Sequence, residues 1–341
     1  MIRPKIVEKT IKKYMPTYFA CISNEQLEKV KGYIQTFTRH SFSATTTGSV
    51  LDMATSSQGK MIRPRLVLMS AAFGPLGASE AAYKLAAIIE MTHLASLIHD
   101  DVVDDSPLRR GKPSVQYAYG KHAAVYAGDF LMSRISYHLM SEGLNQSGMV
   151  LSRTVEAMCA GEIGQARHRY DAEMTIDEYL RHIHGKTVAL FQACCRIGAM
   201  ESGCSDDMID RLEGIGECLG YMFQLRDDLL DFLPDSSTIG KASHQDFREG
   251  IYTLPVLLTR EQPGGALALQ PYFEKSKAHT LTEEDIFCLE ERIAAFGGME
   301  QAWDVIRAYQ KQAVSLIYEL PRNKVTTQLL SLVQKLGAAQ V

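Results

Sequence analysis

Residues 90–105 read EMTHLASLIHDDVVDD, an apolar stretch that ends in a cluster of acids. The apolar residues recur at the three- and four-residue spacing of an α-helix. Acids at the C-terminal end of a helix meet the negative end of its dipole, and they also repel one another. The segment therefore predicts a helix whose end binds a cation.

The spacing of the acids indicates which cation would fit. On a helix, Asp100 and Asp104 lie one turn apart on one face with Asp101 beside them, and His93 lies roughly 10 Å back along the axis. We expect the three carboxylates to converge on one point. Oxygen ligands without nearby sulfur favour Mg²⁺, which often bridges carboxylates to a phosphate. A solvated acidic helix end would give the same pattern, so this cluster alone leaves both interpretations open.

A second acid cluster has the same spacing. Residues 220–231 read GYMFQLRDDLLD, so Asp227, Asp228 and Asp231 also follow an apolar helical stretch. Two such helix ends facing each other would hold a diphosphate through Mg²⁺ and stabilise a departing pyrophosphate. Isolated cations suited to phosphate contacts accompany the clusters, although any one of them alone is more often a solvated surface residue. They are Lys60, Arg63, Arg109, Arg110, Lys186 and Lys241.

The distribution of proline and apolar residues predicts an all-α protein. No proline occurs between Pro113 and Pro234, and strand-like alternation is scarce there. No repeat or low-complexity linker divides the 341 residues, so we expect one helical domain over 1–341, with N-terminal helices in 1–50. Residues 234–249 and 261–265 are the expected irregular segments. Helices are predicted at 81–98, 123–140, 150–163, 176–200, 208–232, 284–296 and 299–320.

Composition excludes several other classes of protein. The net charge is −4 and no long Lys/Arg run occurs, which argues against nucleic acid as a partner. The seven cysteines lack the spacing of a zinc site, and we interpret them as buried small apolar residues in a reducing compartment. No apolar stretch suits a signal peptide or a transmembrane segment of roughly 20 residues. We therefore expect a cytoplasmic protein.

Taken together, these motifs resemble the trans-isoprenyl diphosphate synthase (polyprenyl synthetase) family over nearly the whole chain from about Gly59. The family's motifs occur here in the family's order. They are Gly-Lys-x-x-Arg-Pro at 59–64, Glu-x-x-His at 90–93, DDxxD at 100–104, Arg-Arg-Gly-x-Pro at 109–113, Gly-Glu-x-x-Gln at 161–165, Gly-Lys-Thr at 185–187, Phe-Gln-x-x-Asp-Asp-x-x-Asp at 223–231 and Gly-Lys at 240–241. The resemblance implies a large helical bundle around a central substrate cavity.

The resemblance also implies the role of each site residue. The six aspartates (Asp100, Asp101, Asp104, Asp227, Asp228, Asp231) would hold Mg²⁺, three ions per active site, on an allylic diphosphate that Arg109, Lys186 and Lys241 also contact. Isopentenyl diphosphate would bind Lys60, Arg63, His93 and Arg110. Thr187 and Gln224 would stabilise the carbocation, and the released pyrophosphate would remove the final proton. A core histidine is the alternative for His93, and we interpret His99 as structural.

Family members set product length with residues just before the first DDxxD. Short-chain enzymes have aromatic residues where this chain has Ala95 and Ser96, and no insertion separates Asp101 from Asp104. We therefore expect a C30–C40 product, although a deeper residue such as Met91 would end elongation earlier. Ile251 stands where many relatives have a lysine, which removes one expected phosphate contact.

Four other functions remain as alternatives. A short-chain (farnesyl or geranylgeranyl) diphosphate synthase would share every motif. A class I terpene cyclase normally has an Asn/Ser/Glu metal triad in place of the second DDxxD, and a non-catalytic subunit would have lost acids or cations. A helical binding module would not explain the ordered cations. The resemblance implies a homodimer, or a heteromer with a small non-catalytic subunit.

Overall fold

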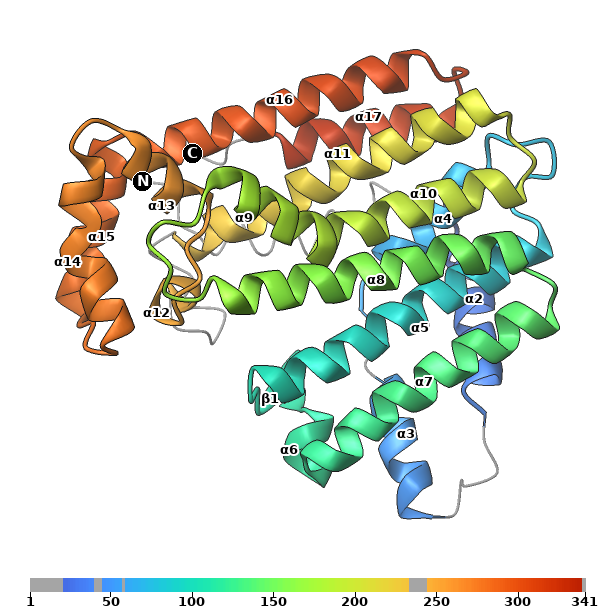
Figure 1. Ribbon diagram of the computed structural model, residues 1–341. Helices are drawn as coiled ribbons and strands as arrows, with labels where there is room; N and C mark the ends of the chain where they lie inside the picture. The colour runs from blue at the N-terminus through green and yellow to red at the C-terminus, as the bar shows by residue number, and fades with distance from the viewer. Residues whose placement is uncertain (1–20, 40–44, 57–58, 233–243, 339–341) are drawn as a thin grey trace. The chain divides into compact units, whose positions relative to one another are not determined.

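The computed structural model describes residues 21–39, 45–56, 59–232 and 244–338. Lys241 and most of the polar segment expected at 234–249 lie outside these ranges. Within them, every regular element is helical except for one short hairpin, which confirms the all-α class (Figure 1).

The chain divides into two compact units, and the prediction of a single domain stays a prediction. The Asp101 unit lies within Phe19–Arg153 and Ala193–Glu213, and the Asp228 unit lies within Thr154–Gln192 and Gly214–Val341. Three helices carry the chain from one unit to the other. They are α8 (Asn145–Arg167), α10 (Ala189–Glu201) and α11 (Asp206–Asp231).

Helix α5 is the centre of the Asp101 unit. It begins after Ser79, whose side chain accepts a hydrogen bond from the N–H of Ala82, and it packs against α2, α4 and α7. Nearly all of its residues from Ala82 to Ala95 are buried, because neighbouring helices surround it. The elements of this unit are α2 (Asn24–Phe37), α3 (Thr46–Ser56), α4 (Ile62–Ala71), α5 (Glu80–Val103), β1 (Leu108–Arg109), β2 (Lys112–Pro113), α6 (Val115–Tyr119) and α7 (Lys121–Ser141).

Helix α13 plays the corresponding part in the Asp228 unit, where it contacts α9, α14, α15 and α16. Helices α16 and α17 lie side by side (Figure 1). Capping boxes at Thr175 and Thr282 start α9 and α15. The remaining elements are α9 (Ile176–Ile183), the π-helix η1 (His184–Val188), α12 (Gln245–Arg248), α13 (Leu254–Glu261), α14 (Gly265–Lys277), α15 (Glu283–Ala295), α16 (Gly298–Tyr318) and α17 (Lys324–Leu336).

Each predicted helix exists, with ends that differ by a few residues. The segment 176–200 is helical as expected but contains the π-helix, which the apolar spacing did not reveal. The break predicted at 261–265 separates α13 from α14. Helix α2 and the start of α3 lie in residues 1–50, where N-terminal helices were expected. The hairpin, α4, α6, α12–α14 and α17 were not among the predicted elements.

The exposure of helix α5 and of the cysteines bears on two interpretations of the sequence. Helix α5 is the one described helix long and apolar enough to cross a membrane, but 72% of the apolar window is buried inside the protein, as in a core helix. All seven cysteines are free, and Cys194, Cys195 and Cys218 are buried as expected. The same expectation is wrong for the other four, since Cys159 is exposed and Cys21, Cys204 and Cys288 are half-buried.

Candidate active site

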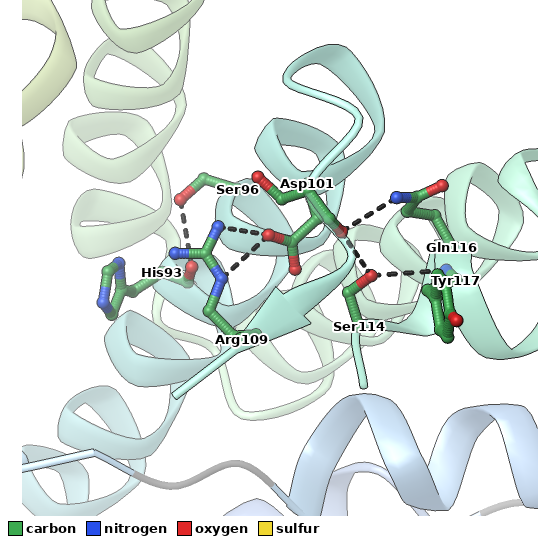
Figure 2. Close-up of polar contacts among 8 residues, drawn as sticks. His93, Ser96, Asp101, Arg109, Ser114, Gln116 and Tyr117 are labelled. Atoms are coloured by element: carbon green, nitrogen blue, oxygen red, sulfur yellow. Dashed lines mark hydrogen bonds and ion pairs between the residues drawn. The ribbon is translucent and has the colours of Figure 1, made fainter. Parts of the chain in front are cut away.

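The first acid cluster forms the C-terminal end of α5. The helix ends at Val103, and the N–H of Asp104 donates to the carbonyl oxygen of Asp100 over 2.8 Å. Asp101 is buried, whereas Asp104 is exposed. Arg109 donates from Nε to Oδ1 of Asp101 over 2.9 Å, and its Nη2 contacts the same oxygen (Figure 2). The buried carboxylate is therefore neutralised by an arginine of the hairpin.

Metal binding by the first acid cluster stays a prediction. Among the described residues, no three His, Cys, Asp or Glu side chains stand close enough together to form a metal site. Asp101 pairs with Arg109, and Asp104 lies just past the last helical residue. Helical spacing placed them on one face, but the local charges decide where each side chain points.

The side chains of two neighbouring arginines in the hairpin extend in different directions. Strands β1 and β2 pair with Arg109 opposite Lys112, which leaves Arg110 and Gly111 as a two-residue turn. Their φ angles of 53° and 76° are those of a type I′ turn, which requires two positive φ angles. Arg109 reaches Asp101, while the guanidinium of Arg110 lies against Gly59.

Gly59 leaves room for that guanidinium. A methyl group at Gly59 would lie 2.4 Å from Nη2 and 2.7 Å from Cζ of Arg110, so only glycine fits without a shift. Lys60 follows and is exposed, and Met61 (φ 54°) then begins α4. The chain therefore places Lys60, Arg110 and the first turn of α4, which contains Arg63, in one region.

A buried charged group accompanies these cations. Glu90 is 2% exposed, and burial raises its pKa while Arg63 and Arg110 lower it. Burial, followed by the positive charges of Arg63, Arg110 and Arg109, lowers the pKa of His93 to about 2. His93 is therefore neutral at physiological pH. The arrangement offers two guanidinium groups and a neutral imidazole to an anion, with Glu90 as the nearby counter-charge.

The two proposed length-determining residues occupy different settings. Ala95 is buried at 1% exposure. Ser96 is half-buried, and its hydroxyl donates to the carbonyl of His93 over 3.0 Å (Figure 2). Neither residue lines the cavity of about 180 Å³ beneath the hairpin, which is bounded by residues of α3, α5, the hairpin and α6. That lining comprises Met53, Ala54, Leu94, Leu97, Ile98, Asp101, Arg109, Lys112, Pro113, Ser114 and Val115.

His99 has the structural role expected for it. Its Nε2 lies 3.3 Å from the carbonyl oxygen of Val125 and 3.5 Å from Oδ1 of Asp129 on α7. A methyl group at Gly128 would lie 2.2 Å from that nitrogen. The ring thus fills the narrow gap where α5 and α7 approach each other.

The second acid cluster forms the end of α11 and again has a buried middle aspartate. Tyr179 donates its hydroxyl proton to Oδ2 of Asp228 over 2.5 Å, and Gln224 donates from Nε2 to Oδ1 over 2.7 Å. Thr187 donates to Oε1 of Gln224 over 2.6 Å, which fixes the orientation of the amide. Asp227 is exposed beside them. Three sequence-predicted residues, Thr187, Gln224 and Asp228, are therefore joined in one chain of hydrogen bonds.

Two glycines allow Lys186 to reach its position. A methyl group at Gly161 of α8 would lie 2.8 Å from the backbone nitrogen of Lys186 and 2.9 Å from Cα of Gly185. At Gly185, it would lie 2.4 Å from the carbonyl oxygen of Ala157. The backbones therefore touch, and Lys186 Nζ lies 3.1 Å from Oε1 of Glu162. The π-helix that carries Lys186 and Thr187 is a feature often found at functional sites.

The charges around the second cluster suit a hard divalent cation. Burial, against the lowering effect of the hydrogen bonds from Tyr179 and Gln224, raises the pKa of Asp228 to about 6; the charge of Asp227 contributes to the rise and that of Lys186 opposes it. Burial and then the charges of Asp228, Asp231 and Asp227 raise the pKa of Asp246 to about 7. One lysine does not offset four carboxylates, and all of the donors are oxygens, so the residues fit Mg²⁺.

Several residues of these clusters escaped the sequence analysis. Tyr179 carries no local sequence signal, because its partner Asp228 lies 49 residues away. Glu90 and Glu162 belong to recognised motifs, but only the structure gives them partners. Asp246 was not among the predicted site residues, and the role of Gly59 depends on the distant Arg110.

Comparison with known proteins identifies the family. The family model described as "Polyprenyl synthetase" matches residues 45–286, so the chain belongs to the polyprenyl synthetase family. It is 33% identical to heptaprenyl diphosphate synthase component 2 of Bacillus subtilis (strain 168), over 82% of this chain and 78% of that protein. It is 35% identical to octaprenyl diphosphate synthase of Escherichia coli (strain K12), over 78% of this chain and 81% of that protein.

Solved structures show the same relationship. A polyprenyl synthase from Caulobacter crescentus CB15, complexed with calcium and isoprenyl diphosphate, superposes with a TM-score of 0.84 at 28% identity. The match covers 95% of this chain and 98% of that one. The fold is therefore that of polyprenyl synthases.

Proposed function

We propose that the chain is a trans-polyprenyl diphosphate synthase that joins isopentenyl diphosphate to an allylic diphosphate and releases diphosphate. The observation that carries the proposal is the divergence of the adjacent arginines. Arg109 accompanies the acids of the first DDxxD, and Arg110 lies at Gly59 in the region of Arg63 and His93. One hairpin thus supplies cations to two places, as an enzyme with two diphosphate substrates requires.

Isopentenyl diphosphate is assigned to the cations around Gly59. Arg63 and Arg110 offer planar, permanently charged donors, and exposed Lys60 adds a mobile charge. His93 is neutral there, so it donates one ring proton without adding a third positive charge beside the arginines. Glu90 keeps the arginines from repelling each other before substrate binds.

The allylic diphosphate is assigned to Arg109, Lys186 and Lys241, with Mg²⁺ held by Asp100, Asp101, Asp104, Asp227, Asp228 and Asp231. The family resemblance gives three ions per active site. When bound, Mg²⁺ supplies the positive charge that stabilises the departing pyrophosphate. Lys186 is held by Glu162 and faces the acids of α11, so its ammonium group is placed to donate to a phosphate oxygen.

The reaction requires stabilised charge but no protein nucleophile. The C1–O bond of the allylic diphosphate breaks, C4 of isopentenyl diphosphate bonds to C1, and a proton leaves C2 for the pyrophosphate. The Thr187 hydroxyl oxygen and the Gln224 amide oxygen are the neutral dipoles that face the positive charge. Their mutual hydrogen bond, and that of Gln224 to Asp228, fix these dipoles before the reaction.

We further propose an all-trans product of C30–C40, because the small side chains of Ala95 and Ser96 leave room for a growing hydrocarbon chain. Burial of that chain contributes about 0.8 kcal/mol per CH₂. The relatives named above for heptaprenyl and octaprenyl products support this range. The name "component 2" of the Bacillus relative supports a small partner subunit as the alternative to a homodimer, and we propose a cytoplasmic location.

The direct test is product analysis. The purified chain is incubated with Mg²⁺, farnesyl diphosphate and labelled isopentenyl diphosphate, and the dephosphorylated products are sized. We expect C30–C40 products that disappear in Asp100→Ala and persist in Asp105→Ala. Asp105 is the matched control, because it is an exposed acid beside the motif that pairs only with Lys121 among the ion pairs described, over 3.0 Å.

Each other outcome has a definite meaning. Products that end at C15 or C20, also with dimethylallyl or geranyl primers, would make the chain a short-chain synthase. Incorporation only after addition of a partner subunit would establish the heteromer. Pyrophosphate release without isopentenyl diphosphate would identify a terpene cyclase and contradict the proposal.

A further inference from the structure

The connection between α5 and α6 is organised around one backbone carbonyl, that of Ser106. The N–H of Ser106 donates to the carbonyl oxygen of Asp101 over 3.0 Å, which ties this residue to the end of α5. Two side chains donate to the carbonyl of Ser106: the hydroxyl of Ser114 over 2.6 Å and Nε2 of Gln116 over 2.8 Å (Figure 2). The carbonyl is therefore held by two side-chain hydrogen bonds.

Both donors are buried, and Ser114 makes a second hydrogen bond. Ser114 is 2% exposed and Gln116 is 8% exposed. The hydroxyl of Ser114 also accepts a hydrogen bond from the N–H of Tyr117 over 3.2 Å, which caps α6. These hydrogen bonds therefore connect the end of α5, the base of the hairpin and the start of α6.

The hairpin between these contacts carries Arg109 and Arg110. The N–H of Ser114 donates to the carbonyl of Pro107 over 2.9 Å, so the contacts close the hairpin at its base. The I′ turn then fixes the two side chains relative to each other. Any tilt of the hairpin moves both guanidinium groups together.

We infer that Ser114 and Gln116 are positioning residues that set the places of Arg109 and Arg110 through the carbonyl of Ser106. The inference rests on the proposed function and extends it, since that function assigns neither residue to a substrate. A misplacement of about 1 Å in a positioned group can reduce activity by roughly 10²-fold. Loss of either donor should therefore weaken the binding of both substrates. By contrast, Arg109→Gln should weaken chiefly the binding of the allylic substrate, and Arg110→Gln chiefly that of isopentenyl diphosphate.

The test compares Gln116→Met, Ser114→Ala and two controls. Gln116→Met keeps the length of the side chain without the donor, and Ser114→Thr keeps the hydroxyl and should behave as wild type. Ser79→Ala removes an equivalent N-cap from the opposite end of α5 and controls for lost stability. Hydrogen–deuterium exchange of residues 105–113 reports on the hairpin, and calorimetry with inorganic pyrophosphate and Mg²⁺ reports on binding without turnover.

We expect exchange in residues 105–113 to accelerate about tenfold in Gln116→Met and Ser114→Ala but not in either control. Pyrophosphate affinity should fall at least fivefold, and KM should rise for both substrates. Unchanged exchange, or faster exchange with unchanged affinity and KM, would overturn the inference. Failure of the wild-type chain to bind pyrophosphate would instead count against the proposed function, and exchange would still decide whether the two side chains hold the hairpin.

Discussion

Replacement of Gly161 by alanine tests the close contact that places Lys186. The new methyl group would lie 2.8 Å from the backbone nitrogen of Lys186, whereas ordinary contact begins at 3.4 Å, so α8 and η1 must separate by about 0.6 Å. The nearest atoms belong to the backbone, so no flexible side chain can move aside. Overpacking of this kind costs about 1–3 kcal/mol. The better helix propensity of alanine returns about 0.5–1 kcal/mol.

The net expectation is a loss of up to about 2.5 kcal/mol, or a fall in Tm of up to about 3.5 °C. Thermal unfolding measures it beside Gly32→Ala, a helical glycine with nothing within 4 Å of a new methyl group, which should gain stability. Because Lys186 moves with η1, KM for the allylic diphosphate should rise in the same variant. If Gly161→Ala is stabilised as much as Gly32→Ala, the close contact does not exist and the reasoning is refuted.

Three further predictions concern single side chains. Because its pKa is lowered to about 2, the His93 imidazole should show no NMR titration between pH 5 and 8 in the free protein. Bound pyrophosphate should raise that pKa, because its negative charge offsets the charges of the arginines. A shift of the His93 signal at pH 6–7 without ligand would contradict this assignment. Thr187→Val should lower kcat about tenfold and stability by about 1 kcal/mol, because Gln224 loses the hydroxyl that donates to its amide oxygen. Unchanged kinetics would show that the orientation of the Gln224 amide does not affect catalysis. Ser96→Phe should shorten the product by two or more isoprene units. Little loss of stability is expected, since Ser96 is half-buried one turn before Asp100. An unchanged product length would exclude Ser96 from length control.

Local sequence patterns sufficed for the helices and the motifs because each depends on residues near one another in the chain. The apolar spacing before Asp100 and before Asp227 predicted both helices, and the acids fixed where each helix would end. The resemblance to the family also followed from short motifs in a fixed order. Charge and proline content excluded other classes in the same way, since they are properties of the chain and not of its folding.

Contacts between distant residues were not available to that reasoning. Helical spacing could not predict that Arg109, which approaches from a hairpin, pairs with Asp101. The same limit hid Tyr179 as the partner of Asp228 and gave no reason for the glycine beside Lys60.

The sequence by itself thus determined the all-α class, the family and the identity of the charged groups, because helical periodicity and motif order are local. Tertiary structure alone decided which partner each charge has and which protonation state His93 adopts. Those properties depend on burial and on the field of charges brought together from separate segments, such as Arg63 and Arg110 around one imidazole. No spacing rule along the chain contains that information.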